Sequence, residues 1–154
     1  MRRLFDAVPT LATRPSLRIV SSTTSPVDFL EQTRVLLVPY IEEASGRVAI
    51  EGLMAGVPTI CARRAGLLEV AGTTAKLLDI PERFTPAHDE VPSARDVEEW
   101  VRTVIAEWDA PDDVRSAWAV RARKDAAERF TVAALAPSYE SALESAVRAK
   151  SRPS

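Results

Sequence analysis

The fold of this chain is decided by residues 34–61, which read RVLLVPYIEEASGRVAIEGLMAGVPTIC. The apolar run Val35–Val38 predicts a buried strand. A polar loop follows, and a helix then begins at Gly46 and ends at Gly56. The residues Val57–Cys61 predict a second strand. A strand, a helix and a strand in this order form one βαβ unit, for which we expect parallel strands and a right-handed crossover.

Candidate binding residues lie where the first strand of this unit passes into the helix. Ligands of open parallel sheets lie beside the carboxyl ends of the strands and the N-termini of the helices. The residues at this place are Glu43, Ser45, Gly46 and Arg47. The unpaired backbone N–H groups of the first helical turn attract an anion such as a phosphate. Gly46 lets a ligand approach the backbone, and Arg47 adds a forked positive charge.

Two glutamates, Glu43 in the loop and Glu51 in the helix, are separated by seven residues. Carboxylates do not bind phosphate, but they accept hydrogen bonds from hydroxyl groups. A phosphate at the helix end with hydroxyl groups on both sides describes a nucleotide sugar. The alternative interpretation is that Glu51 lies on a solvated helix face and that the helix has no ligand.

The run PYIEEASGRVAIEGLMAGVPTI at residues 39–60 resembles the signature of retaining GT-B glycosyltransferases of the glycogen-synthase and sucrose-synthase type, glycosyltransferase family 4. That signature reads roughly PSxxExFGxxxxEAMAxGxPV. The matching positions are Pro39, Glu43, Gly46, Glu51, Met54, Ala55, Gly56 and Pro58. The later run AGLLEV, with Gly66 and Glu69, is similar to the family's GGLPEV. The departures are Tyr40, Ser45, Gly52, Ala65 and Leu68.

The resemblance implies a role for each matching residue. Glu51 would bind the ribose hydroxyl groups of the nucleotide, and Glu43 with Ser45 would bind the donor sugar. The backbone N–H groups of Gly46 and Arg47 would contact the sugar or the distal phosphate. Glu43 is the nearest candidate for a general base, but the resemblance gives it a binding role. We therefore predict no catalytic residue, no metal and no cofactor beyond a UDP-, GDP- or ADP-linked sugar substrate.

Three more residues follow the second strand and are predicted to line the cleft: Arg63, Arg64 and Gly66. The two arginines come directly after the carboxyl end of the strand and therefore belong to the same edge of the sheet. Gly66 is expected to make the tight turn into a short helix, with Glu69 near its start. The alternative interpretation is that both arginines are solvated loop charges.

A complete enzyme of this family has two Rossmann-like domains that face each other across a cleft. The second domain usually begins with a strand, a G-R-L-type turn and a lysine that hold the diphosphate, and no such segment precedes residue 17. We therefore expect one incomplete Rossmann-like domain over residues 1–154. Its α/β fold would have a parallel sheet of about four strands flanked by helices.

The leading hypothesis is that the chain is the donor-binding domain of a cytoplasmic glycosyltransferase. Such a domain would take part in sugar transfer with retention when it is joined to an acceptor domain. We expect the isolated chain to be inactive alone. The second hypothesis is a non-catalytic nucleotide-sugar-binding or interaction domain, a glycosyltransferase remnant. The expected partners are the nucleotide sugar and either a separate acceptor-binding domain or a second copy paired through an exposed sheet edge. An epimerase or dehydrogenase is disfavoured because the GxGxxG fingerprint is absent.

Further elements are predicted at residues 1–13 (helix), 17–20 (strand), 26–33 (helix), 75–80 (strand), 81–93 (Pro-rich loop) and 94–150 (three C-terminal helices). In the helix at 26–33, Val27 and Leu30 are expected to face inward. The single His88 lies in the Pro-rich loop without a partner of metal or catalytic spacing, so we expect it to be exposed.

The C-terminal segment has clear helix signals. Ser93 is a good N-cap and Asp96 follows three residues later, close to a capping box. The second helix is predicted from Asp112 to about Phe130, and the third from near Thr131 to about Lys150. Pro137 falls inside the third helix and indicates either a later start or a kink. The residues of the third helix that are expected to face inward are Leu135, Tyr139 and Leu143. The three tryptophans stand beside apolar neighbours at helical spacing, which favours core packing over stacking on a sugar.

Composition excludes several classes of protein. The chain has 154 residues and a formal net charge of −2, which argues against broad binding to nucleic acid or an anionic membrane. One histidine and one cysteine leave no zinc site of the usual kind and no internal disulfide. The first residues lack the apolar region of a signal peptide, and no apolar run reaches the length of a membrane span. We therefore predict a cytoplasmic protein.

Overall fold

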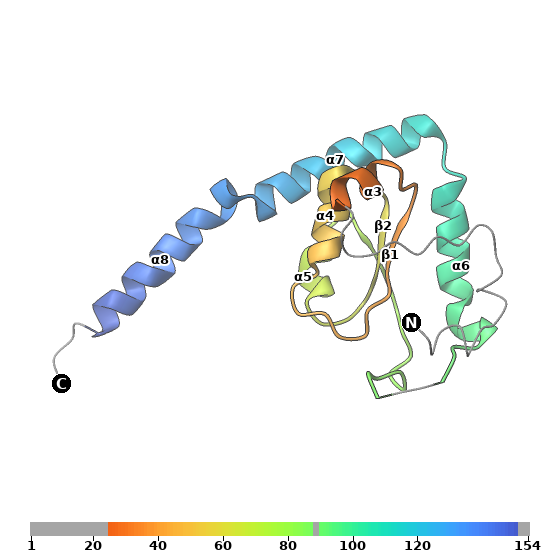
Figure 1. Cartoon of the computed structure of the whole chain (residues 1–154), viewed down its shortest axis with the longest axis horizontal. Coiled ribbons are helices and arrows are strands. Elements are labelled where there is room, and N and C mark those ends of the chain that lie inside the picture. Colours follow the sequence, from red (N-terminus) through yellow and green to blue (C-terminus); the bar gives the residue numbers. More distant parts are fainter. Residues whose placement is uncertain (1–24, 88–89, 151–154) are drawn as a thin grey trace.

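The computed structural model describes residues 25–87 and 90–150, which form an α/β fold with a small parallel sheet flanked by helices (Figure 1). The elements are α3 (Pro26–Glu31), β1 (Leu36–Val38), α4 (Arg47–Ala55), β2 (Thr59–Ala62), α5 (Leu67–Ala71), β3 (Lys76–Leu78), α6 (Ala94–Trp108), α7 (Asp112–Phe130) and α8 (Val132–Lys150). The predictions for residues 1–13, Leu17–Val20 and His88 lie outside the described residues.

The sheet of the described residues has three parallel strands in the order β1-β2-β3. Leu37 pairs with Ile60, and Cys61 pairs with Leu77. All four residues of β2 are buried, as expected for a central parallel strand. Three of the four predicted strands therefore form as expected, within one or two residues at their ends. Among the described residues, β1 and β3 both lie at an edge of the sheet. The pairing of two copies through an exposed sheet edge stays a prediction.

The core lies between the sheet and the helices α4, α5 and α7. Its buried members are Val38, Ala49, Leu53, Cys61, Ala62, Leu67, Val70, Ala122 and Ala126. Helix α4 packs closely on the strands because Gly52 has no side chain. A Cβ atom there would lie 2.4 Å from Leu36 Cδ2 and 2.8 Å from Thr59 Oγ1. Burial also raises the pKa of the Cys61 thiol, to about 11.

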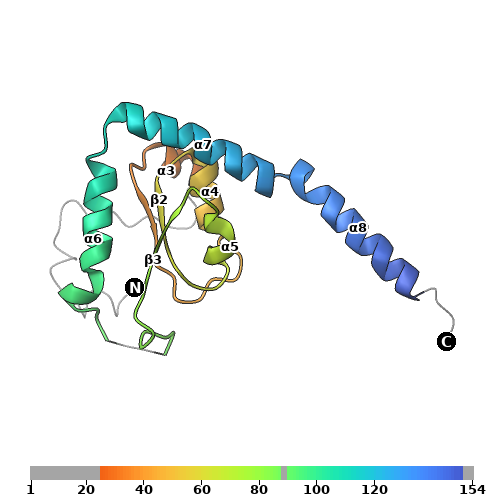
Figure 2. The same ribbon diagram turned by 180° about the vertical axis from the view of Figure 1, so that it is seen from behind.

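Helix α6 lies on the opposite side of the sheet from α4 and α5, and the view from behind shows the same arrangement (Figure 2). The predicted capping box is confirmed, because Asp96 N–H donates to Ser93 Oγ and Ser93 N–H donates to Asp96 Oδ2. The other end of α6 is held by Arg34, whose Nε donates to Trp108 O at 2.7 Å. Trp108 is nevertheless 55% exposed, so the prediction of core packing is wrong for this tryptophan.

Two predictions of inward-facing residues are wrong. Val27 is 62% exposed, because α3 has fewer than two turns and only Leu30 on it is buried. In α8, the residues expected to face inward are exposed, Tyr139 to 66% and Leu143 to 67%. Helix α8 begins where α7 leaves the body and runs away from it, so its apolar side has no described element to pack against (Figure 1). Within the described residues, no helix is long and apolar enough to cross a membrane.

Candidate functional site

The loop between β1 and α4 is organised by the carboxylate of Glu43. Its Oε1 accepts hydrogen bonds from the backbone N–H groups of Ser45 and Gly46, both at 3.1 Å, and from Ser45 Oγ at 3.4 Å. These hydrogen bonds, that from the Ser45 N–H first, hold the pKa of Glu43 below its ordinary value. The structure therefore places an ionised carboxylate at the N-terminus of α4, where the helix dipole favours negative charge.

Gly46 is required by the backbone and by packing. Its φ angle is +59°, in the left-handed region that favours glycine. A Cβ atom at Gly46 would lie 2.8 Å from Val70 Cγ2 and 3.3 Å from Leu67 Cδ2, so helix α5 fills the space beside it. Gly46 is buried, and its N–H group is occupied by Glu43. A glycine is therefore needed at this position because the start of α4 packs directly against α5.

Gly66 joins the loop after β2 to the loop after β1. Its N–H donates to Glu43 O at 2.9 Å, and a Cβ atom at this position would lie only 2.4 Å from Ala44 O. Any side chain would therefore push the two loops apart. The structure thus brings Glu43, Ser45, Gly46 and Gly66 together at the carboxyl edge of the sheet.

Glu51 lies further along α4 and lines a different surface. It borders a hollow of about 500 Å³ between α3 and α4, which we call the apolar groove. The lining residues are Pro26, Val27, Leu30, Glu31, Glu51, Met54, Ala55 and Arg123. The Glu51 carboxylate pairs with Arg47 Nε at 3.3 Å, and the Arg47 side chain is 85% exposed. An exposed i,i+4 pair of this kind is weak, so both side chains can exchange it for a ligand.

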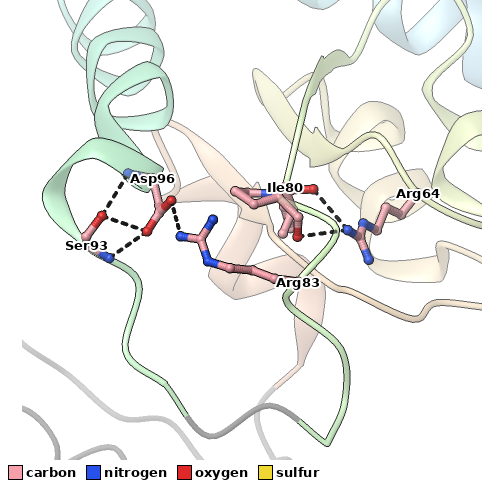
Figure 3. Close-up of polar contacts among 6 residues, drawn as sticks. Arg64, Ile80, Arg83, Ser93 and Asp96 are labelled. Carbon is pink, nitrogen blue, oxygen red and sulfur yellow. Dashed lines mark hydrogen bonds and ion pairs between the residues drawn. The ribbon is translucent and has the colours of Figure 1, made fainter.

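Arg63 and Arg64 lie beyond the carboxyl end of β2, as predicted, but they bind β3 and the segment after it. Arg63 pairs with Asp79 at 3.0 Å and donates to Leu77 O at 3.0 Å. Arg64 donates to the carbonyl oxygens of Ile80, Pro81 and Phe84 at 2.9 to 3.1 Å. Figure 3 shows its bond to Ile80. The three bonds use the fork of this guanidinium to hold the turn that follows β3.

Both arginines line a second hollow of about 940 Å³, which we call the polar hollow. It is bordered by residues 63–64, 79–83, 93, 95–96 and 99–100. Figure 3 shows a polar contact on its lining: the Arg83 guanidinium meets the Asp96 carboxylate, which also binds Ser93. The hydrogen bond from Ser93 and the contact with Arg83 lower the pKa of Asp96 to about 2. Sequence reasoning found the Ser93–Asp96 cap but missed Arg83, because nothing local pairs residues 13 positions apart.

The described residues contain no group of three histidine, cysteine, aspartate or glutamate side chains arranged for a metal ion. Comparisons with protein-family models, with curated proteins and with solved structures give no match.

Proposed function

We propose that this chain is the nucleotide-sugar-binding part of a retaining glycosyltransferase of the GT-B type that residues 39–60 resemble. The observation that carries the proposal is the arrangement of two carboxylates on one βαβ unit. Glu43 is fixed at the N-terminus of α4, and Glu51 lies further along the same helix on the wall of the apolar groove. A nucleoside, a diphosphate and a sugar would follow this helix from Glu51 to Glu43.

The apolar groove suits a nucleoside. Val27 and Met54 expose part of their side chains on its lining, so a base could cover apolar surface there. The ribose hydroxyl groups would donate to the Glu51 carboxylate. Glu51 would give up its weak pair with Arg47, and the Arg47 guanidinium would then be free to meet a phosphate.

The diphosphate and the sugar would occupy the N-terminal end of α4. The first helical turn and Arg47 supply positive charge for the leaving diphosphate, and protein groups of this kind act by orientation and electrostatic stabilisation. The hydrogen bonds from Ser45 and Gly46 all end on Oε1 of Glu43. The sugar hydroxyl is therefore assigned to Oε2 of the same carboxylate.

The same geometry favours a second candidate function, a non-catalytic interaction domain. The carboxylate of Glu43 already occupies the N–H groups of Ser45 and Gly46, as a bound anion would. A helix end that is satisfied by its own chain does not need a ligand for stability. In this alternative the loop is a structural joint, and nucleotides bind weakly or not at all.

Calorimetric titration with UDP, GDP and ADP, each alone and as its glucose or mannose conjugate, separates the two functions. A donor site should bind one of these in the micromolar to low-millimolar range. Glu51→Gln should then weaken binding by about 1 to 3 kcal/mol, because ribose hydroxyl groups lose a charged partner. The matched control is Glu42→Gln, which changes an exposed carboxylate in the loop before α4 and should leave the affinity unaltered. Silence across the panel in a folded sample would contradict the proposal.

A further inference from the structure

The polar hollow has walls that are held in place before any ligand arrives. Arg64 fixes the turn after β3 through three carbonyl oxygens, and Arg83 ties this turn to Asp96 at the start of α6. Trp100 Nε1 donates to Asp79 O at 3.1 Å and joins the next turn of α6 to the end of β3. A volume of about 940 Å³ is in the range of small-molecule sites. The walls of this open hollow are thus preorganised.

The charges on its lining balance. The positive charges are those of Arg63, Arg64, Arg83 and Arg95. The negative charges are those of Asp79, Glu82, Asp96 and Glu99. A bound anion would meet four carboxylates, and a bound cation would meet four guanidinium groups. Hydroxyl groups both donate and accept, so a neutral molecule with many hydroxyl groups can use both kinds of side chain.

Three of these charged side chains are available to a ligand. Arg95, Glu82 and Glu99 make no side-chain hydrogen bond or ion pair with any other residue that the structure describes. Trp100 adds an indole to the same lining, and its half-buried ring packs partly against the core. A tryptophan whose N–H is already bonded presents an apolar surface of fixed orientation.

We propose that the polar hollow binds a neutral carbohydrate, with Arg95, Glu82 and Glu99 on its hydroxyl groups and the Trp100 indole against its C–H face. This site shares no lining residue with the apolar groove. The inference therefore goes beyond the proposed donor site and stands without it. A protein with both sites would bind a glycan and a nucleotide sugar at two separate places.

The test is a titration of the isotope-labelled protein with maltotriose, cellotriose and mannotriose, followed through the indole N–H resonances. One of the three sugars should shift the Trp100 resonance at millimolar concentration and leave those of Trp108 and Trp118 unmoved. A disaccharide that contains glucuronic acid and one that contains glucosamine should bind more weakly than the neutral sugar, because the lining is balanced. Inorganic phosphate should produce no shift of Trp100.

Variants on one turn of α6 separate the site from a structural effect. Glu99→Gln should weaken sugar binding about fivefold, the cost of exchanging one charged acceptor for a neutral one. Glu98→Gln is the matched control, because Glu98 is exposed and does not line the hollow. Both positions are at the surface, so both variants should fold. Arg95→Ala is the second test and should weaken binding to a similar degree.

Three results would overturn the inference. They are no shift of Trp100 with any neutral sugar, tighter binding of a charged probe than of the neutral ones, and equal loss in Glu98→Gln and Glu99→Gln. The nucleotide titration with Glu51→Gln reports on the apolar groove alone. Failure of one site can therefore be told from failure of the other.

Discussion

Helices α7 and α8 follow each other in the chain and each has 19 residues, yet only α7 belongs to the body of the molecule (Figure 1). Helix α7 crosses α4 and buries Ala122 and Ala126 completely. Helix α8 has no buried residue, although Leu143 and Val147 on it are large and apolar. The helix with the smaller inward side chains is thus the one that packs.

Side-chain donors of α7 reach other elements of the body, whereas Ser145 and Arg148 of α8 donate within α8 itself. Arg123 donates to Ala55 O at 2.8 Å, at the carboxyl end of α4. Arg129 donates to Val70 O in α5 at 3.1 Å, and Trp118 Nε1 donates to Thr74 O at 3.1 Å. These three side chains satisfy carbonyl groups at and after helix ends, which otherwise lack partners. The comparison teaches that small residues let one helix approach another closely, and that long polar side chains then hold the two helices together.

The largest expected effect compares two leucines. Leu53→Ala, at a fully buried position on α4 under α7, should lower the free energy of unfolding by about 2 to 5 kcal/mol through lost burial and a cavity. Leu143→Ala on α8 should change it by at most about 0.5 kcal/mol, because this side chain is exposed. Urea unfolding followed by circular dichroism measures both. A large loss at Leu143 would mean that α8 packs on the body in solution.

A smaller effect is expected for two arginines. Arg123→Ala removes the hydrogen bond to Ala55 O and should cost about 1 kcal/mol of stability. Arg148→Ala on α8 breaks only an exposed pair with Glu144 at 2.9 Å and should cost about 0.5 kcal/mol or less. The same unfolding experiment compares them, and equal losses would contradict the role assigned to Arg123.

The smallest effect concerns how stability depends on pH through Asp96, which lies at the start of α6 and contacts Arg83. The folded state lowers the pKa of Asp96 from 3.8 to about 2. Its contribution to stability is therefore present above pH 3.8 and is lost as the pH falls toward 2. In Asp96→Asn the free energy of unfolding should fall less steeply between these two pH values than in the original chain. Glu144→Gln on α8 is the control, and its acid profile should match the original.

The features of this fold that depend on residues close together in the sequence could be predicted. The apolar run at residues 35–38, the glycines at 46 and 56 and the proline at 58 act within a few positions of each other, so the strand, helix and strand follow from them. The cap of α6 by Ser93 and Asp96 is also local. The candidate site was predictable to the same extent: Glu43 and Gly66 lie at one sheet edge because parallel strands end there.

Other features depend on residues that are far apart in the chain. Its spacing predicts that Val27 faces inward, but the neighbours of α3 bury only Leu30. The ties of Arg64 to the turn after β3 span 16 to 20 residues, and that of Arg123 to Ala55 spans 68. A pattern of apolar spacing states which side of a helix could be buried, but it does not supply the surface that buries it.

The sequence by itself therefore determined the βαβ unit, the parallel sheet, the bounds of the C-terminal helices and the two glutamates on one helix and its loop. These depend on backbone conformation and on periodicity, which short segments encode. Only the tertiary structure decided that α7 packs and α8 does not, that Glu43 binds its own loop, and that four arginines and four carboxylates surround one hollow. Such contacts require chain segments to meet in space, and their energy is gained only after the fold has brought them together.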